Sequence, residues 1–474
     1  MELTLLGTAA PSGLPRPSCP CAACATAVGA EARGATSLLV DGLLLLDLTP
    51  GPAFAAARAG RSISGVRALL LSHPHDGPAV EFPAGLPAPG RVPDGRELAL
   101  LSGHRVRAVS VDAPGTGYEV TGPQGERLLY LPPGCAPAGL RAGSPPREGG
   151  PYDMVLLDVP GRPDALALLR EVGAVDAATD VLAVHLDHDV PPGPELHRRL
   201  AVGGARAVPD GTTLLVGEYH AVPDLPRRTL VLGGARSGKS LEAERRLATF
   251  PEVLYVATGG TREGDPEWAA RVSVHRERRP GSWRTTETCD LVPLLTAKGS
   301  TEKQLPGRRH PQDGPGAARR VGGGTAERSD EGWSDGGRSD GGYEGYEARR
   351  AAEQRAELSA ELTRDDAPLL IDCLALWLTD AMDAVGAWDD ATWSNGGERR
   401  LRERVDQLVA AVRATRRTLV AVSNEVGSGV VPATASGRRF RDELGRLNAA
   451  FAAECEQVLL VVAGQAVPLR GGNA

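Results

Sequence analysis

One short glycine-rich segment carries the residues best suited to phosphate chemistry. It matches the pattern G-x-x-x-x-G-K-S and comprises Gly233, Gly234, Ala235, Arg236, Ser237, Gly238, Lys239 and Ser240. Glycines let the backbone curl until several N–H groups point at one phosphate, while Lys239 adds a positive charge and Ser240 a hydroxyl suited to Mg²⁺. Lysine occurs at only two other positions, 298 and 303. We therefore predict that this loop binds the phosphates of a nucleotide.

The residues on either side of the loop supply the context that it requires. An apolar run, residues 229–232, precedes the loop, and a helix-forming stretch, residues 240–247, follows it. In a strand–loop–helix unit, the helix N-terminus adds partial positive charge where a phosphate would lie. A glycine-rich turn that fits the pattern by coincidence is the alternative, and this context disfavours it.

A histidine lies among arginines downstream of the loop. Residues 269–280 read Ala-Ala-Arg-Val-Ser-Val-His-Arg-Glu-Arg-Arg-Pro, with the histidine at position 275. The arginines form a second candidate site for a polyanion. The neutral imidazole of His275 can attack a phosphorus atom and form a phosphoramidate. On spacing alone, a surface histidine in a basic helix is the favoured interpretation, because a single histidine is weak evidence.

Two clusters near the N-terminus have the composition of metal sites. Cys19, Cys21 and Cys24 form a C-x-C-x-x-C pattern suited to a structural zinc ion, with His220 as a candidate fourth ligand by residue type. An empty or redox-active cluster is the alternative. Residues 71–78 read Leu-Ser-His-Pro-His-Asp-Gly-Pro and place a second cluster after an apolar run.

The second cluster resembles the H-x-H-x-D-H metal motif of the metallo-β-lactamase fold, in an incomplete form. His73 and His75 are present, but Asp76 comes one residue early and Pro78 stands where the last histidine belongs. Residues 131–134, where the bridging aspartate is expected, read Leu-Pro-Pro-Gly and contain no aspartate. His185 and His188 resemble the late histidines of that fold. Because a two-metal centre needs about five to seven ligands, we expect this part to be catalytically inactive.

Length and composition predict a globular protein of several domains. The chain has 474 residues, 41% of them hydrophobic, and a formal net charge of −7. That charge argues against a dedicated nucleic-acid binder. No apolar run is long enough to cross a membrane and the N-terminus does not resemble a signal peptide, so a cytoplasmic location is expected.

The order of apolar and glycine-rich segments predicts an α/β protein with two domains. Residues 1–222 are expected to form an αββα domain of the degenerate metallo-β-lactamase-like type. Residues 227–296 and 367–470 are expected to form a doubly wound domain with a mostly parallel sheet. Within it, Asp372 follows an apolar strand, where an acid contacts Mg²⁺ or ribose or caps the next helix. Residues 297–350 are too polar to pack and are predicted to be a disordered insertion.

Several motifs of the second domain together resemble the adenosylcobinamide kinase / adenosylcobinamide-phosphate guanylyltransferase family. They are the loop at 233–240, Val-Leu-Tyr-Val-Ala-Thr at 253–258, Ala-Arg-Val at 270–272 leading into His275, and Trp-Arg-Thr at 283–285 with Glu287. The longest match, Ser-Asn-Glu-Val-Gly-Ser-Gly-Val-Val-Pro, covers residues 423–432. The resemblance spans about 229–296 and 367–470.

The resemblance implies a bifunctional enzyme of cobalamin assembly. Such an enzyme phosphorylates adenosylcobinamide with ATP or GTP, then transfers GMP from GTP onto that phosphate through a guanylylated histidine, which by position is His275. It also implies Mg²⁺, a homotrimer and a set of nucleotide contacts: Ala257, Thr258, Gly259, Arg276, Glu277, Arg278, Arg279, Glu287 and Asp372. The family usually has Glu at position 372, and its connection before residue 367 is much shorter. An active N-terminal phosphodiesterase and a regulatory nucleotide-binding protein are the alternative functions.

Overall fold

The computed structural model describes residues 1–74, 82–140, 144, 149–218, 220, 226–259, 279–296 and 367–471. Contacts divide the chain into two units, Met1–Leu291 with Ala367–Ala474, and Val292–Asp366. The predicted insertion, residues 297–350, lies outside the described residues. None of the helices in the described ranges is long and apolar enough to cross a membrane.

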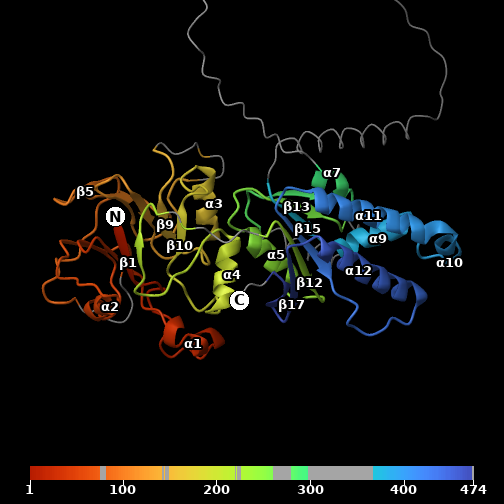
Figure 1. Ribbon diagram of the computed structural model, residues 1–474, viewed down its shortest axis with the longest axis horizontal. Helices are drawn as coiled ribbons and strands as arrows, with labels where there is room; N and C mark the ends of the chain where they lie inside the picture. Colours follow the sequence, from red (N-terminus) through yellow and green to blue (C-terminus); the bar gives the residue numbers. More distant parts are fainter. Residues whose placement is uncertain are drawn as a thin grey trace, which may run out of the picture. The chain divides into compact units, whose positions relative to one another are not determined.

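Two sheets occupy the N-terminal part of the chain (Figure 1). The first has the order β11-β1-β2-β3-β4, with strands β1 (Glu2–Gly7), β2 (Ser37–Val40), β3 (Leu44–Leu46), β4 (Ala68–Leu70) and β11 (Thr213–Leu215). The second has the order β10-β9-β8-β7-β6-β5, with strands β5 (Glu97–Ala99), β6 (Arg105–Val109), β7 (Gly117–Thr121), β8 (Arg127–Tyr130), β9 (Met154–Leu157) and β10 (Asp180–Ala183).

Alternation along these strands builds a four-layer αββα arrangement. Leu44 and Leu46 pack with Tyr118 and Tyr130 in a core shared by the two sheets. Leu45 points to the opposite side, into a cluster with Ala56 of α2 (Pro52–Arg58). The outer face of the second sheet packs on α3 (Pro163–Glu171) and α4 (Pro194–Val202). The predicted αββα layering is therefore confirmed.

A third sheet of seven strands is formed by residues 228–470. Its order is β14-β13-β15-β16-β12-β17-β18, with strands β12 (Arg228–Gly233), β13 (Leu254–Ala257), β14 (Arg284–Glu287), β15 (Leu369–Asp372), β16 (Leu419–Asn424), β17 (Gln457–Val462) and β18 (Gln465–Arg470). All neighbouring pairs are parallel except β17 with β18, which is antiparallel. This confirms the predicted mostly parallel sheet.

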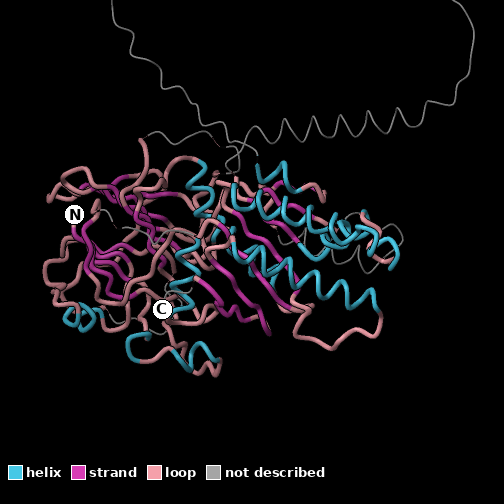
Figure 2. Tube along the Cα trace, turned by 45° about the vertical axis from the view of Figure 1, so that its right-hand side comes forward, coloured by secondary structure: helices cyan, strands magenta, loops and turns pink. Residues whose placement is uncertain are grey.

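Helices connect the parallel strands of this sheet, as Figure 2 shows. They are α5 (Lys239–Leu247), α7 (Leu291–Thr296), α9 (Leu374–Ala384), α10 (Asp390–Thr392), α11 (Glu398–Ala414) and α12 (Ala435–Ala453). Helix α5 leads outward from β12 to β13, whereas α9 and α11 lead back from β15 to β16. Because parallel crossovers are right-handed, connections that run in opposite directions cover opposite faces of the sheet.

Candidate functional site

The register of the parallel strands brings the predicted nucleotide residues to one edge. Gly233, at the end of β12, lies opposite Asn424 at the end of β16. Ala257, at the end of β13, lies opposite both Asp372 on β15 and Glu287 on β14. Ligands of open α/β sheets bind outside the carboxyl ends of the strands. Residues that are far apart in the sequence thus meet where a nucleotide is expected.

The loop between β12 and α5 has the close packing that its glycines predict. A Cβ atom on Gly233 would meet the Ser237 hydroxyl at 2.4 Å and the Val461 carbonyl at 2.7 Å, so a side chain there would push the loop open. Gly238 has φ +96° and directly precedes α5. The ammonium group of Lys239 donates to the Gly234 carbonyl at 3.2 Å. The lysine therefore folds over the loop.

Hydrogen bonds join the ends of β13 and β15. The Thr258 hydroxyl donates to the Cys373 carbonyl at 2.6 Å and accepts from the Cys373 N–H at 2.8 Å. Thr258 is buried, and its hydroxyl bonds to the backbone of Cys373. The Asp372 carboxylate accepts a hydrogen bond from the Tyr255 hydroxyl at 2.7 Å.

A cavity of about 470 Å³ lies beside β14 and is lined by Arg279, Pro280, Gly281, Trp283, Thr285 and Glu287. It brings together two predicted nucleotide contacts, Arg279 and Glu287. The guanidinium group of Arg279 also donates to the Thr285 hydroxyl at 3.2 Å. The remaining predicted contacts of this segment, His275, Arg276, Glu277 and Arg278, lie outside the described residues.

The three N-terminal cysteines gather around a histidine other than the predicted one. The Nδ1 atom of His188 lies 3.2 Å from the sulfur of Cys19, 3.5 Å from that of Cys21 and 3.6 Å from that of Cys24. All four ligand atoms lie within 4.8 Å of one another. The prediction of His220 as the fourth ligand was wrong, because His188, which follows β10, occupies that place.

The spacing of this Cys₃His cluster fits a tetrahedral zinc ion. At ordinary zinc bond lengths, the ligand atoms lie about 3.5–3.8 Å apart. The pKa of the Cys21 thiol is lowered to about 7, mainly by the hydrogen bond that it accepts from the Cys24 N–H. An ion pair between Arg16 and Asp187 joins the cysteine loop to the segment that carries His188. The cluster therefore links two segments that are far apart in the sequence.

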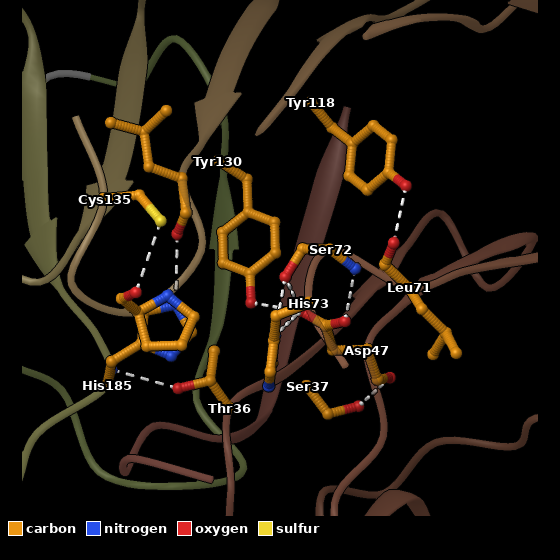
Figure 3. Close-up of polar contacts among 12 residues, drawn as sticks. Thr36, Ser37, Asp47, Leu71, Ser72, His73, Tyr118, Tyr130, Cys135 and His185 are labelled. Carbon is orange, nitrogen blue, oxygen red and sulfur yellow. Dashed lines mark hydrogen bonds and ion pairs between the residues drawn. The ribbon is translucent and has the colours of Figure 1, made fainter. Parts of the chain in front are cut away.

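The described part of the incomplete histidine motif, which includes Ser72 and His73, contacts a buried carboxylate, Asp47 (Figure 3). Asp47 accepts hydrogen bonds from the Ser72 N–H at 2.7 Å and from the Tyr130 hydroxyl at 2.6 Å. The Ser72 hydroxyl lies 2.8 Å from Nδ1 of His73. His75, Asp76 and Pro78 lie outside the described residues. The contacts around Asp47 thus hold β3, β8 and the segment after β4 together.

His185 lies at the edge of this network, with its ring centroid 6.1 Å from that of His73. Its Nε2 atom lies 3.1 Å from the Leu131 carbonyl, which assigns the proton to Nε2. Among the described residues, its Nδ1 atom has no hydrogen-bond partner. Burial, reinforced by His73, lowers the pKa of His185 to about 4.

Sequence reasoning missed both Asp47 and a second carboxylate in this region, Asp158. Asp158, which follows β9, lines a cavity of about 720 Å³ together with His185 and Asp187. Burial raises the pKa of its carboxyl group, and hydrogen bonds from the N–H groups of Gly161 and Gly134 oppose that rise. The sequence did contain a signal for Asp158, because an aspartate stands at the end of an apolar run there, as it does at Asp372.

Acid should destabilise the N-terminal part through His185. In an unfolded chain, histidine titrates near pH 6.5. The folded protein keeps His185 neutral down to about pH 4, so unfolding takes up a proton between these values and stability falls as the pH falls. Between pH 7 and 4.5, the melting temperature should fall less for His185→Gln than for the wild-type protein. The exposed His197→Gln is the control, and equal declines in all three proteins would contradict this role.

Sequence comparisons identify relatives of the part of the chain that carries the loop. The family model "Cobinamide kinase / cobinamide phosphate guanyltransferase" matches residues 229–305 and 344–469. The bifunctional adenosylcobalamin biosynthesis protein CobU of Salmonella typhimurium is 30% identical over 243 residues, 51% of this chain and 98% of that protein. The corresponding CobP of Pseudomonas aeruginosa is 33% identical over 245 residues, 52% of this chain and 98% of that protein.

Solved structures match the chain at lower identity. A diphosphatase from the PhnP family has 20% identity over 45% of this chain and 96% of that chain, with a TM-score of 0.34. Zn(2+)-bound PqqB from Methylobacterium extorquens has 18% identity over 45% of this chain and all of that chain, with a TM-score of 0.32. Likeness at this level assigns no activity. By its sequence relatives, the chain belongs to the cobinamide kinase / cobinamide phosphate guanyltransferase family.

Proposed function

We propose that the C-terminal part of the chain carries out two successive reactions on a corrinoid. It phosphorylates adenosylcobinamide with ATP or GTP and then transfers GMP from GTP to the new phosphate, giving adenosylcobinamide-GDP. Family membership supports the pair of reactions. The observation that carries the proposal is the shared sheet edge, where the register aligns the ends of β12, β13, β14 and β15.

The kinase step depends on positioning and positive charge more than on acid–base groups. The 233–240 loop is suited to hold the triphosphate, with Lys239 neutralising charge on the phosphate oxygens. Ser240 and Asp372 offer the hydroxyl and carboxylate oxygens that Mg²⁺ prefers, so they would hold the ion. When bound, Mg²⁺ supplies further neutralisation of charge on the phosphates.

The transfer step needs a nucleophile, for which we propose His275. Its neutral imidazole nitrogen forms a bond to the α-phosphorus of GTP, and pyrophosphate leaves. A phosphate oxygen of adenosylcobinamide phosphate then attacks the same phosphorus, and the imidazole leaves as the phosphoramidate bond breaks. Arg276, Arg278 and Arg279 would stabilise the phosphate charge.

Lys239→Ala should abolish phosphorylation of adenosylcobinamide. Cations of this kind are worth roughly 10³-fold or more in the rate of phosphoryl transfer. The measurement is product formation from labelled ATP or GTP by the full chain. Lys303→Ala provides a matched lysine substitution and should retain the wild-type rate. A Lys239→Ala protein with near wild-type turnover would remove the loop from the reaction.

We also propose that Cys19, Cys21, Cys24 and His188 bind one structural zinc ion. The donor set supports this, because three thiolates and an imidazole match the preference of zinc. With four protein ligands, the site leaves no position for a substrate or a reactive water. The ion would therefore stabilise the loop around α1 (Ala22–Thr26) rather than take part in catalysis.

The purified chain should contain about one zinc ion. His188→Ala should lose most of it and lower the melting temperature, because a structural ion contributes directly to folding. His220→Ala should keep both the metal and the melting temperature. Elemental analysis by mass spectrometry makes the measurement. Zinc retained at the wild-type level after replacement of all three cysteines by serine would place the metal elsewhere.

A further inference from the structure

Tyr255 contacts both Asp372 and Arg279, which the family resemblance gives as two separate nucleotide contacts. It lies within β13, two residues before Ala257. The register pairs Tyr255 with Leu370 and Ala257 with Asp372, so Tyr255 and Asp372 are diagonal neighbours on the same face of the sheet. From that position its hydroxyl donates to Oδ2 of Asp372 at 2.7 Å.

The ring of Tyr255 makes a second contact. The guanidinium carbon of Arg279 lies 3.3 Å from the ring centroid, a close cation–π contact. Arg279 also donates to Thr285 on β14 and lines the same cavity as Glu287. One side chain thus contacts the carboxylate at the end of β15 and the arginine that leads into β14.

Tyr255 is buried, with 3% of its surface exposed. A carboxylate oxygen only accepts hydrogen bonds, so the phenolic O–H is the donor and its proton points to Oδ2 of Asp372. Such a hydrogen bond to an ionised acceptor is stronger than one between neutral groups.

We propose that Tyr255 is a positioning residue of the nucleotide site, orienting the Asp372 carboxylate toward the metal–triphosphate and Arg279 toward the base or phosphate in the adjoining cavity. This rests on the proposed role of Asp372 in the kinase step. The aspartate side chain has a single methylene and its carboxylate reaches few positions, so the direction of that carboxylate decides whether it meets the ion.

The chain contains a matched tyrosine away from this edge. The Tyr152 hydroxyl donates to Glu119 at 3.0 Å, and the Arg127 guanidinium lies 4.8 Å from its ring centroid. Tyr152 is 5% exposed. Tyr152→Phe removes a hydroxyl from a similar environment in the N-terminal part, so it measures the general cost of losing a buried tyrosine–carboxylate bond.

The test measures the Mg²⁺ concentration that gives half-maximal binding of a non-hydrolysable GTP analogue to the full chain. Tyr255→Phe should raise this concentration about tenfold, the size expected for one hydrogen bond to a charged group, while the packing of the ring is retained. Tyr152→Phe should leave it unchanged. Asp372→Asn should raise it as well, and the Tyr255→Phe/Asp372→Asn double variant should match Asp372→Asn alone, because the hydroxyl acts through the carboxylate.

Three outcomes would overturn the positioning role. They are a Tyr255→Phe value within twofold of wild type, a rise of equal size in Tyr152→Phe, and effects that multiply in the double variant. The binding assay needs no turnover. If the wild-type protein binds the Mg²⁺–nucleotide complex yet does not phosphorylate adenosylcobinamide, the proposed function fails while Tyr255 is still tested. The kinase assay on the same proteins separates these results.

Discussion

The candidate nucleotide site depends on one constraint, the parallel register of β13, β14, β15, β16 and β12. Parallel strands end at the same edge of the sheet, so the loop after β12 and the acids at the ends of β14 and β15 lie at one edge although they are far apart in the sequence. A shift of one residue in β15 would turn Asp372 to the other face, away from Tyr255. The hydrogen bonds between Thr258 and Cys373 oppose such a shift.

The polar residues of the N-terminal part form two separate groups, a buried hydrogen-bond network around Asp47 and a cysteine–histidine cluster. The buried carboxylate, Asp47, accepts hydrogen bonds from Ser72 and Tyr130. The cysteine cluster, in contrast, gathers four zinc-type ligands within 4.8 Å. The N-terminal part thus contains a hydrogen-bonded carboxylate in its core, a cluster of ligands suited to zinc, and a cavity lined by His185 and Asp158.

Local patterns were the features that sequence could predict. The phosphate loop and the cysteine triplet each lie within eight residues, and the layering of both parts follows from short apolar runs. Sequence could not predict pairings that depend on the order of strands. His188 is 164 residues from Cys24, and its contact requires the segment after β10 to reach α1. Tyr255 meets Asp372 only because β13 and β15 are neighbours, although 117 residues separate the two.

The central claim is that the edge of the seven-stranded sheet serves a covalent transfer of GMP as well as a kinase reaction. The most direct measurement is incubation of the full chain with GTP labelled at the α-phosphate, followed by proteolysis and mass spectrometry of the labelled peptide. The account predicts one acid-labile GMP group on His275, and no label after His275→Ala, since alanine offers no nucleophile. GMP on another residue, or label on His275→Ala at the wild-type level, would contradict it.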